Sequence, residues 1–378
     1  MRILVIGAGV AGTALAAMLE GRGHHIKIIE RSTDFSKSGY ALSLWPLGSR
    51  VLIGLGAIEA FRKVAQPLET YHLKNGVGEQ INTYDLRALI APHGDTGTLS
   101  RKDLLTLLRH RIVNTPIIMG RSITQLNHLP LETEVTFDDG SVEYFDLVVG
   151  ADGIHSKTRY LIAGDVPVHE TGWGGWVWWA PHGTVPVTDV TEYWGAGRFL
   201  GLYPTADQIC VFAGGPTSKI SQEIAGRRQH VLDHFAALNP TLPSVFDALP
   251  FDDQDIFFWK LDDVRSPIWS KGRVVLLGDA ATAFLPTAGL GASMALESAA
   301  ILADELLRVE AKNIPRALSL YEKRHRHRVE HAQTESRHLA KTMLINSTPL
   351  AIARDLLMKH YSVENFVAGI MKSLDEPI

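Results

Sequence analysis

The chain has 378 residues, of which 46% are hydrophobic and 21% are charged, and its formal net charge at pH 7 is −4. This composition is typical of a globular protein with two or three domains, and the negative charge argues against a nucleic-acid partner. One cysteine, Cys210, excludes an internal disulfide and favours the cytoplasm. Glycines interrupt the first apolar run, so we expect no signal peptide and no integral membrane segment.

The first 30 residues carry a dinucleotide-binding pattern. We expect an apolar strand over 2–6, the turn Gly7-Ala8-Gly9-Val10-Ala11-Gly12, a helix, and a strand over 25–29 that ends in Glu30. In this context the first glycine permits the turn, the second lets a pyrophosphate approach the backbone, and the third allows close helix–strand packing. Glu30 lies where a carboxylate accepts hydrogen bonds from a ribose. The pattern predicts a bound dinucleotide and leaves FAD and NAD as alternatives.

Two further segments follow before residue 110. Residues 39–58 are expected to form a loop across the ligand and then a short helix. Ser100 and Asp103 have the spacing of a capping box, which predicts a helix that starts beside Arg101. The Arg101 side chain is either a solvated surface charge or a contact to a phosphate or ribityl chain.

Strands are expected over 117–126 and 132–149, with a hairpin turn at Asp139-Gly140. The last of these strands is apolar and leads into Asp152 and Gly153. It therefore delivers a second acidic side chain to the carboxyl end of a buried strand, where open α/β folds bind their ligands.

The composition changes near residue 165. Five of the eight tryptophans lie between Trp173 and Trp194, in runs that alternate like strands of a mostly antiparallel sheet. A helical segment over 218–238 and a return strand over 257–261 are expected to follow. Aromatic side chains on a sheet are either core packing or a wall for a flat apolar ligand.

Residues 272–293 combine a short apolar strand, Gly278-Asp279, a loop rich in proline and glycine, and the start of a helix. The glycines let the backbone approach a ligand closely, and the free N–H groups of the helix start suit a group that becomes anionic, such as a reduced flavin.

The rest of the chain is expected to be helical from 294 to about 342 and amphipathic over 350–358. His327 and His331 are four residues apart, but no carboxylate or third ligand accompanies them. They are read as part of a solvated helix face, and no metal site is expected.

Taken together, the chain resembles the group A flavoprotein monooxygenases, which have the p-hydroxybenzoate hydroxylase fold, over roughly residues 1–340. The resemblance rests on four segments in order: the glycine turn with Glu30-Arg31, Leu99-Ser100-Arg101, residues 150–156, and residues 278–281 with the proline and glycines that follow. It implies an α/β fold with a Rossmann-like FAD-binding domain (1–165 and 265–345, with part of 40–100 facing the substrate). An inserted, mostly antiparallel substrate sheet (166–264), a long C-terminal helix and a helical extension (346–378) complete the expected fold.

The resemblance further implies FAD as cofactor and NADH or NADPH as reductant. Oxygen would add at flavin C4a, and the hydroperoxide would hydroxylate an aromatic or polycyclic small molecule in a monomer or homodimer. The expected cofactor-binding residues are Gly7, Gly9, Val10, Ala11, Gly12, Glu30, Arg31, Arg101, Asp152, Gly153, Gly278, Asp279, Pro286, Gly289, Leu290, Gly291 and Ala292. The expected substrate-facing residues are Tyr40, Trp45, Trp176, Trp178, Tyr193, Arg198 and Phe284. No residue stands out as a catalytic acid or base.

The chain departs from the family pattern at three places. Thr282 stands where the family usually has histidine, Leu290 lies between the two loop glycines, and Trp178-Trp179 replaces a Trp-Arg pair. The loss of that arginine predicts a less anionic substrate. Three alternatives stay open: a flavin dehydrogenase or oxidase without oxygen insertion, a flavin-dependent halogenase suggested by residues 176–181, and a non-catalytic flavin-binding protein.

Overall fold

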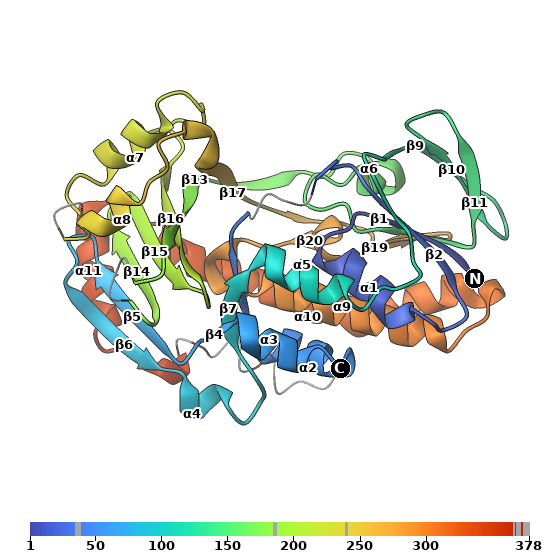
Figure 1. Cartoon of the computed structure of the whole chain (residues 1–378), viewed down its shortest axis with the longest axis horizontal. Helices are drawn as coiled ribbons and strands as arrows, with labels where there is room; N and C mark the ends of the chain where they lie inside the picture. Colours follow the sequence, from blue (N-terminus) through green and yellow to red (C-terminus); the bar gives the residue numbers. More distant parts are fainter. Residues whose placement is uncertain (35–38, 184–186, 239–240, 366, 368–371, 373–378) are drawn as a thin grey trace.

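The computed structural model describes residues 1–34, 39–183, 187–238, 241–365, 367 and 372. Two large sheets lie side by side, and long helices run beneath one of them (Figure 1). The predicted C-terminal extension, 346–378, lies outside the described residues at 366, 368–371 and 373–378. In the part of the chain that is described, no helix combines the length and the apolar character that crossing a bilayer requires.

The first sheet has six strands in the order β18-β19-β12-β1-β2-β8, and all neighbours except β18 and β19 pair in parallel. Parallel strands buried on both faces are continuous apolar runs, as the sequence 2–6 is. Their carboxyl ends form one edge of the sheet, and residues 7, 151 and 277 follow at that edge. The strands are β1 (Arg2–Ile6), β2 (His25–Glu30), β8 (Ile117–Met119), β12 (Leu147–Gly150), β18 (Ser270–Lys271) and β19 (Val274–Leu276).

Helices cover one face of this sheet, where α9 (Gly291–Leu307) packs against both α1 (Val10–Leu19) and α10 (Ile314–Met343) (Figure 1). The segment predicted to be helical from 294 to about 342 consists of two helices, α9 and the long α10. The chain turns at 308–313, and Pro315 occupies the first turn of α10, where its missing N–H costs nothing. Two shorter helices lie close to this layer: α5 (Arg101–Arg109), which contacts α1, and α6 (Lys157–Ala163). A separate three-stranded sheet is made of β9 (Ile123–His128), β10 (Thr133–Phe137) and β11 (Val142–Phe145).

The second sheet has eight strands in the order β20-β17-β13-β16-β15-β14-β5-β6 and is mostly antiparallel. It draws on three stretches of chain, because β5 and β6 precede residue 90 and β20 follows residue 280. The substrate sheet predicted over 166–264 is therefore only its central part. Its strands are β5 (Thr70–Asn75), β6 (Gln80–Asp85), β13 (Val168–Pro181), β14 (Val190–Gly195), β15 (Arg198–Pro204), β16 (Gln208–Pro216), β17 (Phe257–Arg265) and β20 (Thr282–Ala283).

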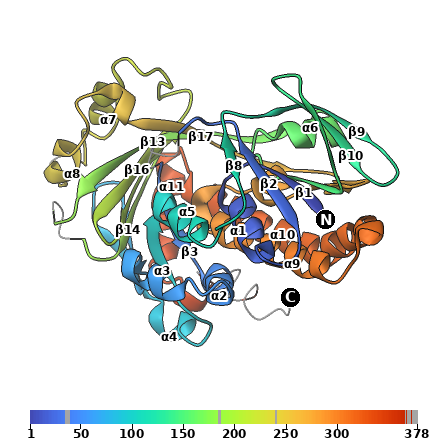
Figure 2. The same cartoon turned by 45° about the vertical axis from the view of Figure 1, so that its right-hand side comes forward.

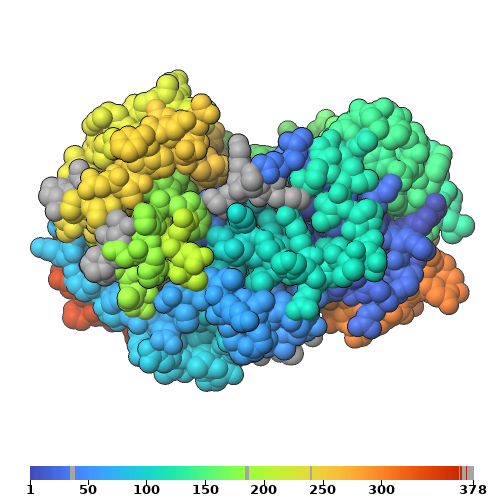
Figure 3. Space-filling model, in the orientation of Figure 1, coloured from blue at the N-terminus to red at the C-terminus, as the bar shows by residue number. Residues whose placement is uncertain are grey.

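Two short helices, α7 (Arg227–His234) and α8 (Pro243–Asp247), cover the outer face of the second sheet and enclose a core separate from that of the first (Figure 2). The helix predicted over 218–238 is therefore much shorter than expected. Figure 3 shows this region as a lobe, with a dip in the upper outline between it and the lobe that carries β9 to β11.

The remaining elements close the molecule around these sheets. The loop predicted at 39–58 contains a strand, β3, which pairs with β7 and brings Tyr40 beside the start of α5. The helix α11 packs against β6 and β14. These elements are β3 (Ala41–Leu44), α2 (Pro46–Gly54), α3 (Ile58–Val64), β4 (Gln66–Pro67), α4 (Arg87–Ile90), β7 (Gly97–Ser100) and α11 (Thr348–Met358).

A fully enclosed carboxyl group, Glu192 on β14, ties three parts of the second sheet together. It accepts hydrogen bonds from the Tyr71 hydroxyl, from the Tyr203 hydroxyl at 2.5 Å and from the Trp194 indole N–H at 2.7 Å. Burial raises the pKa of Glu192, and its three donors counter that rise. Such a network is stable only while every buried donor has an acceptor.

We expect Glu192→Gln to lower the free energy of unfolding by roughly 1–3 kcal/mol, because the amide offers one acceptor oxygen and turns an NH₂ group toward buried donors. Urea unfolding of the two proteins measures this difference. Glu223→Gln, at an exposed position, is the matched control and should stay within about 0.5 kcal/mol of wild type. A Glu192→Gln protein as stable as the control would contradict the prediction.

Candidate active site

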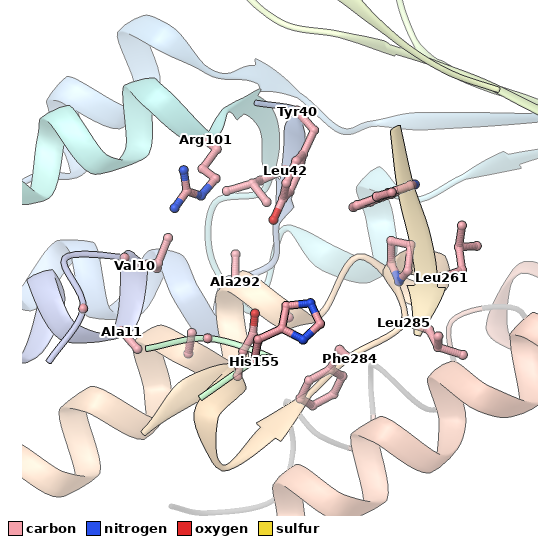
Figure 4. A pocket seen from close by; sticks show the side chains of 18 of the residues that line it. Val10, Ala11, Tyr40, Leu42, Arg101, His155, Leu261, Phe284, Leu285 and Ala292 are labelled. Atoms are coloured by element: carbon pink, nitrogen blue, oxygen red, sulfur yellow. The ribbon is translucent and has the colours of Figure 1, made fainter. Parts of the chain in front are cut away.

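A cavity of about 580 Å³ lies between the two sheets, at the carboxyl ends of β1, β12 and β19. It begins at the glycine turn after β1, passes Arg101, Tyr40 and Ala292, and reaches the second sheet near Leu261 (Figure 4). Ligands of open α/β sheets bind at this edge. The volume lies within the usual range for a small-molecule or cofactor site.

The three glycines of the turn have different surroundings. Gly9 leaves room for a ligand, whereas Gly7 and Gly12 allow close packing within the protein. A Cβ atom on Gly7 would lie 2.3 Å from the Ala151 carbonyl oxygen, and one on Gly12 would lie 2.2 Å from the Gly7 carbonyl oxygen. A Cβ on Gly9 would meet nothing within 4 Å, although Gly9 lines the cavity. The open space above Gly9, at the start of α1, is therefore available to a group that approaches the backbone, as a pyrophosphate does.

Glu30 is held in place at the end of β2. Its carboxylate accepts hydrogen bonds of 2.9 Å from the backbone N–H groups of Ala8 and Ser32. These bonds fix the carboxylate beside the glycine turn, where it lines the cavity.

Asp152 has a structural role that the sequence pattern did not indicate. Its carboxylate accepts hydrogen bonds from the Ser156 hydroxyl at 2.5 Å and from the backbone N–H of Thr158 at 2.9 Å. It therefore orders the loop that leads into α6. Arg159, on that helix, donates to the carbonyl oxygen of Ala280 at 3.0 Å and so ties this loop to the segment that carries Asp279.

The Asp279 carboxyl faces the interior of the cavity, with no hydrogen-bond donor to it among the described residues. Desolvation raises its pKa to about 6, and the positive charge of Arg101 counters part of that rise. The pKa of Tyr40 is also raised, by burial first and by the charge of Asp279 second. The carboxyl group is exposed to the cavity and has no donor of its own there in the described part of the chain, so this position suits a ligand that supplies hydroxyl groups.

The loop after Asp279 ends at the first turn of α9. Gly289 has φ +62°, and a Cβ there would lie 3.0 Å from the Ser43 side chain. The first N–H groups of a helix have no partner within it, and Gly291 and Ala292 present this turn to the cavity. Leu290 instead turns into the core, with 1% of its surface exposed.

Most of the residues predicted to bind the cofactor line this one cavity, although they come from five separate stretches of the chain. They are Gly7, Gly9, Val10, Ala11, Glu30, Arg31, Arg101, Asp152, Gly153, Asp279, Pro286, Gly289, Gly291 and Ala292. Gly12, Gly278 and Leu290 do not line it; Gly12 and Gly278 pack closely against neighbouring turns.

The predicted substrate residues divide differently. Tyr40 and Phe284 line the cavity, whereas Trp176, Trp178 and Tyr193 are buried in the core between the second sheet and the helices α7 and α8. Side chains alternate between the faces of a strand, and these three belong to the face turned away from the cavity. The prediction that these three side chains face the substrate is therefore wrong, and they are packing residues.

The other two predicted substrate residues also lie away from the cavity lining. Trp45 is buried, and its backbone N–H donates to the Ser293 hydroxyl at 3.0 Å. Arg198 opens β15 beside His234, whose pKa it helps to lower after the larger effect of burial.

The cavity-facing residues of the second sheet were missed by the sequence analysis. They are Trp173, Gly174, Gly175, Phe199, Tyr203, Phe212, Ala213, Gly214, Trp259 and Leu261. The alternation in the sequence of β13 and β16 predicted strands, each of which has two faces. It did not indicate which face meets the ligand, because that depends on where α7 and α8 pack.

Comparison with known proteins agrees with this site. Residues 1–336 match the family model described as FAD binding domain. A 6-hydroxynicotinate 3-monooxygenase of Pseudomonas fluorescens is 27% identical over 342 residues, which cover 85% of this chain and 86% of that protein. A 3-amino-4-hydroxybenzoate 2-monooxygenase of Streptomyces cremeus is 28% identical over 373 residues, which cover 95% and 92%.

The fold is also that of a solved flavoprotein. Klebsiella pneumoniae HpxO, complexed with FAD and uric acid, superimposes with a TM-score of 0.89 at 24% identity, over 99% of this chain and 96% of the other. The Rossmann-like sheet and its glycine turn define a dinucleotide-binding protein of the α/β class. The chain belongs to the FAD binding domain family, among the FAD-dependent monooxygenases. The predicted resemblance to the group A enzymes and the predicted cofactor, FAD, are confirmed.

Proposed function

We propose that this enzyme uses NADH or NADPH and O₂ to hydroxylate a small aromatic molecule beside bound FAD. The observation that carries the proposal is the single cavity that joins the glycine turn of the first sheet to the aromatic face of the second. A cofactor anchored at the turn therefore shares one enclosure with a flat substrate.

The residues of the first sheet fit FAD. In this proposal the pyrophosphate lies above Gly9 at the N-terminus of α1, Glu30 binds the adenosine ribose, and Asp279 accepts hydrogen bonds from the ribityl hydroxyls. Arg101 lies near the pyrophosphate and ribityl chain. The positive end of α9, at Gly291, faces the part of the flavin that becomes anionic on reduction.

When bound, FAD supplies the redox chemistry and the activation of oxygen. The protein's contribution is to position the substrate, to exclude water and to place fixed dipoles where negative charge develops. Tyr40 stands where the two halves of the cavity meet, with its hydroxyl turned into the cavity (Figure 4).

We further propose that residues 1–165 and 265–345 form the FAD-binding domain, that 166–264 with β5 and β6 form the substrate domain, and that the enzyme works in the cytoplasm as a monomer or homodimer. The dependence on NAD(P)H and the single buried Cys210 support this location.

The test combines two measurements on the holoenzyme. Anaerobic NADPH or NADH should bleach the flavin absorbance, and faster when a substrate is present. In air with ¹⁸O₂, the product should carry one labelled oxygen atom. Bleaching without label in the product would indicate a dehydrogenase or oxidase. No bleaching with either nucleotide would contradict the proposal and indicate a separate reductase.

A further inference from the structure

Four aromatic side chains form a continuous wall at the far end of the cavity, which we call the aromatic slot: Tyr40, Trp259, Phe212 and Tyr203. Their ring centroids follow one another at 5.1 Å, 5.0 Å and 5.4 Å in that order. All four line the cavity. The rings are inclined to one another by 48°, 48° and 81°, so they offer both aromatic faces and ring edges to a planar aromatic ligand.

Between these large side chains, the strands beside the slot carry glycines. Gly174 and Gly175 on β13 and Gly214 on β16 line the cavity, so the sheet presents bare backbone there. Phe284 lies on the other side of the cavity, on the loop before α9 (Figure 4). The cavity at this point therefore has bare strand backbone on one side and an aromatic ring on the other.

Ionisable groups are distributed unevenly along the cavity. The acidic and basic side chains that line it lie on the first sheet, the loops after it and the start of α5: Glu30, Arg31, Arg101, Arg121, Asp152, His155, Lys157 and Asp279. His155 lies on the same side of the cavity as Phe284 (Figure 4). Among the described residues that β13, β15, β16 and β17 contribute to the lining, none is Lys, Arg, His, Asp or Glu.

The ionisable group behind the slot on the sheet side is an acid. Glu192 lies directly behind Tyr203, whose hydroxyl donates to it, and its other acceptor bonds are filled by Tyr71 and Trp194. A carboxylate entering the slot would lose its hydration, find no cation on the sheet and approach another carboxyl group.

We propose that the aromatic slot selects flat, uncharged aromatic compounds and rejects aromatic carboxylates. This inference rests on the proposed function and narrows its substrate class. It sets the chain apart from the relatives named for 6-hydroxynicotinate and 3-amino-4-hydroxybenzoate, both of which are ring carboxylates.

The test is equilibrium binding to the FAD holoenzyme, without NAD(P)H and without oxygen, followed through the absorbance of the bound flavin. Matched pairs differ only in a carboxylate: phenol with 4-hydroxybenzoate, and 4-hydroxyquinoline with 4-hydroxyquinoline-2-carboxylate. The neutral member of a pair should bind at least about 100-fold more tightly, because the described strands that form the slot offer no cation to a carboxylate. Tighter binding of the acids, or no binding by any neutral member, would overturn the inference.

Two variants locate the effect in the slot. Phe212→Arg places a guanidinium group between Tyr40, Tyr203 and Trp259, and should shift the binding ratio toward the acids by at least about 10-fold relative to Phe212→Met, which adds no charge. His155→Gln should leave the preference of wild type unchanged. If the preference for neutral compounds is lost in His155→Gln and unchanged in Phe212→Arg, the selection takes place outside the aromatic slot. Should Phe212→Arg fail to fold, the ligand pairs and His155→Gln still decide the matter.

These measurements separate the inference from the function on which it rests, since binding needs no turnover. Tight binding of neutral compounds together with an unlabelled product would retain the slot and reject the hydroxylation. A product of an aromatic acid that carries ¹⁸O would support the hydroxylation and reject the selectivity of the slot.

Discussion

A serine in place of Gly9 is expected to weaken FAD binding at least 100-fold, about 2.7 kcal/mol, while leaving the apoprotein as stable as wild type. The protein has room for the new side chain, because a Cβ at this position meets nothing within 4 Å. The backbone has φ −75° and ψ −173°, which any residue adopts, and serine is a preferred residue at a helix N-cap. The space that the side chain fills is the space proposed for the pyrophosphate.

The matched control lies three residues further on. In Gly12→Ser the Cβ would lie 2.2 Å from the Gly7 carbonyl oxygen, and this backbone atom cannot move aside without disturbing the turn. Gly12→Ser should therefore lower the stability of the apoprotein itself, by several kcal/mol. Thermal unfolding of the two apoproteins and titration of flavin fluorescence distinguish the two effects. A Gly9→Ser protein that binds FAD like wild type would show that the pyrophosphate does not lie above this residue.

The second large effect concerns acid stability and a buried histidine far from the cavity edge. The His325 imidazole on α10 is 0% exposed, and its Nε2 lies 2.8 Å from the Ser298 hydroxyl on α9. That hydroxyl donates to the Met294 carbonyl at 2.7 Å, so Nε2 carries the proton and Nδ1 is left without a partner among the described residues. Burial lowers the pKa of His325 to about 3, and the charges of Arg328 and Arg324 add to this.

The sign of the pH dependence follows from the lowered pKa. Above about pH 6.5 the imidazole is neutral in both the folded and the unfolded chain, so the two states bind the same number of protons at this residue. Below that pH the unfolded chain binds a proton that the folded chain rejects, so stability falls by about 1.4 kcal/mol per pH unit until the pH approaches 3. Between pH 6.5 and 4.5 the loss from His325 amounts to about 3 kcal/mol.

Urea unfolding of the holoenzyme at pH 7 and pH 4.5 measures this loss. His325→Gln should lose about 3 kcal/mol less stability between the two pH values than wild type does, since glutamine does not titrate. His327→Gln, at an exposed position two residues along the same helix, should follow wild type. If the free energy of unfolding depends on pH equally in His325→Gln and in wild type, the imidazole has the same pKa in the folded and the unfolded chain.

The sequence alone determined the features that depend on local spacing. The strands expected over 2–6 and 25–29 are found at Arg2–Ile6 and His25–Glu30, because a buried parallel strand, a glycine turn and a helix each leave a short-range pattern. Ser100 accepts a hydrogen bond from the Asp103 N–H as its capping spacing predicts. The family and the cofactor were implied by the resemblance of four such segments, in order, to a known family.

Only the tertiary structure decided which face of a strand meets the ligand and how much room there is at each glycine of the turn. Trp176 and Trp173 lie on one strand, yet Trp176 packs under α7 and α8 whereas Trp173 lines the cavity. Alternation along a strand specifies two faces, and the choice between them depends on helices more than 50 residues away in sequence. The sequence pattern gives Gly9 and Gly12 different roles, but the clearance at each of them is seen only in the structure. They differ because the space around each is set by segments that meet it only after folding, Ala151 and the Gly7 carbonyl among them.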